Sequence, residues 1–140
     1  MSRIDGMKQA IELLNALGPK ERKSLLENMR KRDPKMTAFL EENLLSFEDL
    51  KNLSVKQLAE LLREIHIPDL ALGLRIGSQA LKTHILNNVS SRIRDDIEQV
   101  LLGPPQPVNK VEEAVSKVMV VVKNKMEKGE IVLSDDDELV

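Results

Sequence analysis

Signals that begin and end helices recur along nearly the whole chain, and they constrain its fold more than any other feature. Gly18-Pro19 and Asp33-Pro34 each close one helix and open the next, because proline fits the first turn of a helix but not its interior. Ser54 followed by Gln57 fits a capping box. Between these signals apolar residues recur three and four positions apart, as on the buried face of a helix. The sequence therefore predicts an all-α fold, with helices near residues 5–17, 19–33, 34–40, 55–65 and 79–88, a short helix from Pro68, a helix capped by Ser90, and a short turn capped by Ser46.

Residues 108–128 are the one region that a propensity argument could misassign. The valines at 120–122 favour strands. Gly129, however, stands where a left-handed helix C-cap belongs, and residues 103–107, with three prolines, form an extended connection before the segment. Apolar residues also keep helical spacing across the segment, so we predict one long helix. These residues are Val111, Val115, Val118, Met119, Val122 and Met126.

Composition and local motifs argue against catalysis. The 140-residue chain has no cysteine, so disulfides, thiolate metal sites and thiol nucleophiles are excluded. His66 and His84 each lack a second ligand at metal spacing, and we expect both to be surface or partly buried histidines. Gly73 and Gly77 are too sparse for a phosphate loop. The sequence predicts a non-enzymatic protein with no metal, no cofactor and no small-molecule substrate.

Neither the charge nor the hydropathy of the chain indicates that it binds nucleic acid or spans a membrane. The net charge is −2, and the basic residues between 20 and 35 have no interleaved aromatics for stacking on bases. The longest wholly apolar run covers residues 118–122, whereas a bilayer span needs about 20 residues. We expect a cytoplasmic protein whose partners are other proteins.

Several short motifs follow one another in a recognisable order: LLSFEDL at 44–50, LLREI at 61–65 and DLALGLR at 69–75. This order resembles the C-terminal half of the flagellar rotor (motor switch) protein family, FliG. In that family an MFxF-E-D-[IV] hinge precedes L-x-E-[IV], D-L-A-L-A-L-[KR] and a helix opening near S-x-R, and G-P, a long helix and G-E-[IM]-[IV] follow. The resemblance extends from about Met7 to Leu133.

The resemblance implies a division of the chain into three parts. Residues 1–45 would form an armadillo-like three-helix unit, which must stack on a neighbour to cover its apolar face. Residues 46–133 would form a six-helix C-terminal bundle that carries a charged ridge. Residues 134–140, mostly acidic, are expected to be a disordered tail. Leu44, Leu45 and Phe47 would form the hinge, with Phe47 packed between the two helical parts.

The resemblance also implies a functional surface. Arg75 and Arg92 correspond to basic residues of the family ridge, and Asp95 and Asp96 correspond to its acidic pair. In the family this ridge meets the cytoplasmic loop of the stator. The implied function is therefore that of a motor switch component in flagellum-dependent motility and chemotaxis. Its partners would be the stator loop, other rotor subunits and further copies stacked by helices, with only an indirect link to the membrane through the basal body.

Departures from the family pattern leave alternatives open. Only the second Phe of the hinge is present, Gln106 replaces an Arg, and the ridge helix is about two residues shorter. Arg92 with Asp96 and Arg94 with Glu98 could also be ordinary pairs within one helix. The chain could be an excised fragment or a short diverged paralogue, and Met1 and the acidic end favour the paralogue. It could instead be a non-motor adaptor that keeps the fold, in which case charging Ile11 or Leu14 would abolish stacking. A more distant alternative is the regulatory region of a magnesium transporter.

Overall fold

The computed structural model describes residues 3–133, which form helices joined by short loops, without a strand. The predicted all-α fold is confirmed. The predicted tail at 134–140 lies outside the described residues. No helix between residues 3 and 133 is both long enough and apolar enough to cross a membrane.

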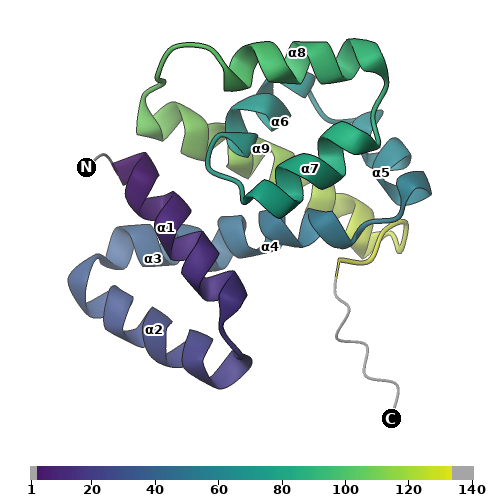
Figure 1. Cartoon of the computed structure of the whole chain (residues 1–140). Coiled ribbons are helices and arrows are strands. Elements are labelled where there is room, and N and C mark those ends of the chain that lie inside the picture. The colour runs from purple at the N-terminus through teal and green to yellow at the C-terminus, as the bar shows by residue number, and fades with distance from the viewer. Residues whose placement is uncertain (1–2, 134–140) are drawn as a thin grey trace.

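The elements follow one another with short connections (Figure 1). In chain order they are α1 (Arg3–Ala16), α2 (Pro19–Arg32), α3 (Pro34–Phe39), the π-helical segment η1 (Leu40–Leu44), α4 (Leu45–Glu48), the 3-10 helix η2 (Asp49–Asn52), α5 (Val55–Leu62), α6 (Ile67–Leu74), α7 (Gln79–Asn87), α8 (Ser91–Leu101) and α9 (Val108–Glu127).

The helix starts follow the local chemistry of the sequence. Asp33 accepts a hydrogen bond from the Met36 N–H at 3.0 Å, and Ser54 and Gln57 form both bonds of the predicted capping box. Proline occupies the first turn of α2 and of α3. Asp33 and Ser54 thus accept from N–H groups that the first turn of a helix leaves without an intrahelical partner, and each proline simply lacks such an N–H.

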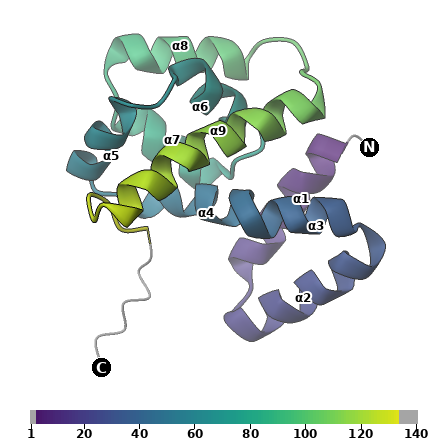
Figure 2. The ribbon, with the colours of Figure 1, turned by 180° about the vertical axis from the view of Figure 1, so that it is seen from behind.

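Helix α9 is the central element of the C-terminal part, and it is a helix as predicted. Its buried stripe includes Val111, Val115, Val118 and Met119, and it packs against α6, which packs in turn against α8 (Figures 1 and 2). Gly129 has φ of +72°, so the predicted left-handed C-cap is confirmed.

The segment from α3 to η2 is one uninterrupted helical run. In η1 the N–H of Leu45 bonds to the carbonyl of Leu40, five residues earlier, instead of four. Ser46 lies inside this run, so the expectation that it caps a separate turn is wrong. The division predicted between residues 45 and 46 falls within the run and stays a prediction.

The N-terminal helices differ in how well they are covered. Met7, Ile11 and Leu14 of α1 are fully buried. Helix α2 packs on α3 but has no buried residue, and Figures 1 and 2 show it at the outer edge of the molecule, away from α5–α9. Burial of Ile11 and Leu14 contradicts their assignment to an open stacking surface, because the chain itself already covers them.

Candidate protein-interaction site

The charged ridge is built on α8, whose start and orientation are fixed locally. Ser90 accepts a hydrogen bond from the Ile93 N–H at 3.2 Å, which begins the helix. Ile97 is fully buried, and α8 packs against α6 on that side. The opposite side of α8 therefore faces solvent.

Three of the four predicted ridge residues lie on this solvent side. Arg92, Asp95 and Asp96 are all exposed. At 100° per residue Arg92 and Asp96 lie on one flank of α8 and Asp95 lies almost opposite Ile97, whereas Arg94 and Glu98 lie on the other flank. Arg94 and Glu98 form the predicted ion pair at 2.7 Å. Within the described part of the chain Arg92 and Asp96 form no ion pair, so that predicted pair is absent and these charges face solvent.

Arg75, the fourth predicted ridge residue, lies at the end of α8 and not on its outer flank. Its guanidinium donates to the Val100 carbonyl oxygen at 3.1 Å from Nε and 2.6 Å from Nη2, and to the Gly103 carbonyl oxygen at 2.7 Å. A cation is favoured there because the last turn of a helix leaves carbonyls without partners. Arg75 therefore fixes where α8 ends, and only part of its side chain is exposed.

The predicted hinge residues lie inside the molecule. Leu44 and Phe47 are fully buried, and Leu45 is half-buried. A methyl group added at Gly73 of α6 would come within 3.0 Å of the Phe47 ring and within 3.0 Å of the Val115 side chain of α9. The Phe47 ring therefore packs against α6 at Gly73, where Val115 of α9 also packs.

Beside the hinge lies a buried carboxylate that the sequence reasoning missed. Glu48 is 1% exposed, and it accepts hydrogen bonds from the Asn15 amide at 3.1 Å and from the Ser78 N–H at 2.7 Å. It thereby links α1 to the start of α7. The only sequence signal was its position between Phe47 and Leu50, both apolar and both buried.

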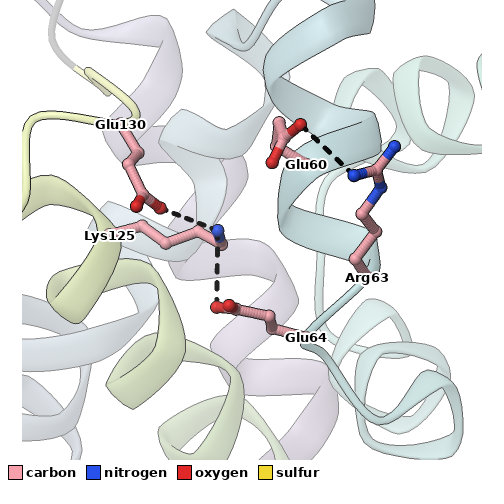
Figure 3. Close-up of polar contacts among 5 residues, drawn as sticks. All are labelled: Glu60, Arg63, Glu64, Lys125 and Glu130. Atoms are coloured by element: carbon pink, nitrogen blue, oxygen red, sulfur yellow. Dashed lines mark hydrogen bonds and ion pairs between the residues drawn. The ribbon is translucent and has the colours of Figure 1, made fainter.

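A second ionic cluster, also missed, closes the end of α9 (Figure 3). The Lys125 ammonium lies 2.9 Å from Glu130 and 3.3 Å from Glu64, and the lysine side chain is 4% exposed. The hydrogen bond with Glu130 raises the pKa of Lys125, and the same bond lowers the pKa of Glu130. The cluster joins the turn after α9 to the end of α5.

The histidines behave as predicted. His66 is exposed, and His84 is partly buried with Nε2 2.8 Å from the Leu53 carbonyl oxygen. Among residues 3–133 no three His, Cys, Asp or Glu side chains are grouped as metal ligands would be. The arrangement as a whole offers exposed charges on a well-anchored helix, which suits contact with another protein.

Comparison with known proteins gives one consistent result. The family model for the FliG C-terminal domain matches residues 27–133. The flagellar motor switch protein FliG of Bacillus subtilis (strain 168) is 28% identical over 135 residues, and that of Thermotoga maritima is 30% identical over 137 residues. Each alignment covers 95% of this chain and 40% of the relative, so the chain spans less than half the length of these relatives. The crystal structure of FliG residues 116–343 from Helicobacter pylori matches with a TM-score of 0.58 at 27% identity, covering 91% of this chain and 57% of that chain.

Proposed function

The chain belongs to the FliG C-terminal domain family, and on this premise we propose that it is a component of a flagellar motor switch that serves flagellum-dependent motility. Its place would be the cytoplasmic face of the basal body, with the stator loop and other rotor subunits as partners. The role is mechanical and not enzymatic.

The exposed flank of α8 is the observation that carries this proposal. Arg92, Asp95 and Asp96 present charges of both signs to solvent, and no ion pair within the described residues occupies them. Exposed charges attract a complementary surface over about 8–10 Å and exchange quickly, which suits repeated transient contact. The buried Ile97 and the Arg75 bonds hold α8 in place, so a force on the flank would pass into the bundle.

An adaptor without a motor role is the second candidate, and one observation favours it. Leu25, Leu26 and Met29 of α2 are only partly buried, which leaves apolar surface for stacking on a partner. Because Ile11 and Leu14 are buried, a charge at either would unfold the chain and would not report on stacking. A charge at Leu25 or Leu26 tests this candidate more cleanly.

Charge reversal on α8 distinguishes the two functions. The segment replaces the matching part of a full-length FliG, and motility is scored for Arg92→Glu and Asp95→Lys together. We expect swimming to be impaired while the free energy of unfolding changes by only about 0–1 kcal/mol, because exposed charges contribute little. Binding to the stator loop should also weaken as salt is added.

A matched control lies on the same helix. Exchanging Arg94 and Glu98 keeps the net charge and alters the other flank, so this variant should swim normally. If the Arg92 and Asp95 variant also swims like the unmutated graft, the ridge assignment is wrong. If the Leu26→Lys graft then fails, the adaptor function is supported instead.

A further inference from the structure

A groove of about 280 Å³ lies between α5 and the connection from α7 to α8. Figure 1 shows these elements together at the right of the molecule, at the end of α8 opposite its link to α9. Apolar side chains line the groove on both sides: Ala59 and Leu62 of α5, and Val89 and Ile93 around the start of α8. Leu62, Val89 and Ile93 pack against the core with part of their surface left open to the groove.

One side of α5 extends this apolar surface beyond the groove. Val55, Ala59 and Leu62 are spaced by four and three residues, so they lie along the same side of the helix. Val55 is 59% exposed, and Ala59 is exposed as well. Leu58 and Leu61, which hold α5 on the bundle, are buried. The open apolar surface is therefore additional to the face that fixes α5 in place.

The polar side chains of the groove already have partners close by in the chain. Asn88 donates from its amide to the His84 carbonyl oxygen at 2.7 Å, and Ser90 accepts from the Ile93 N–H at 3.2 Å. Arg63 lies 3.7 Å from Glu60 one turn earlier. What the groove leaves without a partner is its apolar surface, and the bonds of Asn88 and Ser90 fix its shape before anything binds.

The groove adjoins the exposed flank of α8. Ile93 lines the groove, and Arg92 is the residue immediately before it. Asp95 and Asp96 follow about one helical turn later, roughly 5 Å along the axis. Apolar surface, a positive charge and two negative charges thus come one after another from the start of α8.

We propose that the partner which contacts the α8 flank also inserts an apolar side chain into this groove. The occupant is an amphipathic segment of that partner, with an apolar anchor, an acidic side chain opposite Arg92 and basic side chains opposite Asp95 and Asp96. The inference rests on the proposed function, because it describes the partner of the same flank. It adds to that function a contact that does not depend on charge.

The apolar contact gives the interaction a component that salt does not remove. Exposed charge pairs contribute little and are screened as salt rises. Apolar surface taken out of water keeps its contribution when salt is added. The binding should therefore weaken with salt to a plateau and should not vanish.

Two opposite charges at one position separate the apolar contact from the electrostatic one. Ala59 is exposed, so Ala59→Glu and Ala59→Arg leave the core intact, and thermal unfolding confirms that each variant is folded. A peptide of the host's stator loop is titrated onto the full-length graft at about 0.1 M and about 1 M salt, where the Debye lengths are about 10 and 3 Å. Both variants should weaken binding roughly tenfold or more at both salt concentrations, because either charge would be buried under the apolar anchor.

A matched control is Ala80→Glu, which charges another exposed alanine in the first turn of α7, at the far end of that helix from the groove. This variant should bind like the unmutated graft. Arg92→Glu with Asp95→Lys should weaken binding at about 0.1 M salt and have little further effect at about 1 M.

The outcomes for the groove and for the flank are distinct. The groove inference is wrong if the Ala59 variants bind normally, or if Ala59→Arg strengthens binding while Ala59→Glu weakens it. It is also wrong if about 1 M salt abolishes binding of the unmutated graft. If only the Ala59 variants weaken binding, the groove is supported and the charged flank fails. A loop peptide that does not bind the unmutated graft at either salt concentration refutes the proposed function, and the inference with it.

Discussion

Helices α2 and α9 have the same kind of amphipathic pattern but very different surroundings. In α9 the apolar stripe is buried among α5, α6 and α4, whereas α2 contacts mainly α3 and buries no residue. Both helices end with basic residues in their last turn, but Lys125 of α9 is enclosed while Arg30 of α2 is exposed. Periodicity therefore identifies which face of a helix is apolar, and only the neighbouring elements determine whether that face is covered.

The largest expected loss of stability comes from replacing one of the two phenylalanines of the chain by alanine. Phe47 is fully buried against α6 and α9, so Phe47→Ala should lower the free energy of unfolding by ~3–5 kcal/mol. Phe39 of α3 is only partly buried, and Phe39→Ala should cost roughly 1–2 kcal/mol. Denaturant unfolding of both variants measures the difference. Equal losses would show that the N-terminal helices are as well packed as the bundle.

The next largest loss of stability is expected for a methionine of α9, and it can be compared with the loss for a methionine of α2. Met119 of α9 is 1% exposed, and its replacement by alanine should cost ~2–5 kcal/mol. Met29 of α2 is partly buried, so the same replacement should cost roughly half of that or less, in proportion to the apolar area it removes from water. A loss for Met29 as large as that for Met119 would mean that α2 is covered by another molecule, for instance by self-association. Repeating the melts at several protein concentrations separates these cases.

A smaller loss of stability is expected when the link between α1 and the start of α7 is removed. Glu48→Ala leaves the Ser78 N–H and the Asn15 amide without an acceptor, which should cost about 1–3 kcal/mol. Glu42→Ala is the control, since this exposed residue lies on the same helical run and its replacement should change stability by less than about 0.5 kcal/mol. Amide exchange should show faster opening of α1 in the Glu48 variant. Unchanged exchange in α1 would contradict the linking role.

The smallest effect concerns the two ion pairs at the helix ends. The pKa of Glu130 is lowered from 4.5, so its contribution is present above that pH and is lost as pH falls through the lower folded value. The pKa of Lys125 is raised from 10.5, so its contribution is present below that pH and is lost as pH rises through the higher folded value. Glu130→Gln should therefore lower the thermal midpoint at neutral pH and have little effect well below pH 4.5. Glu41→Gln, which removes the exposed pair with Arg30, should change the thermal midpoint less than Glu130→Gln does. A larger change for Glu41→Gln would show that the exposed pair on α2 stabilises the chain more than the enclosed pair on α9.

Much of the fold could be predicted because residues close in sequence determine where the helices begin and end. The Ser54 capping box, the prolines at 19 and 34 and the cap at Gly129 each act within a few residues, and all lie where the sequence placed them. The turn expected after Ser46 failed because packing around Leu44 and Phe47 keeps the helix continuous, and no local signal records that packing.

The candidate site was predictable only in part, for a related reason. The exposure of Arg92, Asp95 and Asp96 follows from their positions opposite Ile97, so periodicity could find it. The position of Arg75 at the end of α8 depends on a contact across more than 20 residues of chain, and so does the link between Glu48 and Ser78. Contacts of that range depend on how the helices pack, and one sequence read alone does not contain them.

The π-helical turn of η1 has a consequence for how related chains diverge. One turn there holds an extra residue, because the Leu45 N–H reaches back to Leu40. Each residue advances a regular α-helix by about 100°, so a deletion there would rotate the two flanking segments relative to each other, whereas removing the extra residue of η1 would give an ordinary α-helical turn and leave α3 and α4 nearly in phase. Related chains could therefore gain or lose one residue at this point while the helices on either side kept their packing.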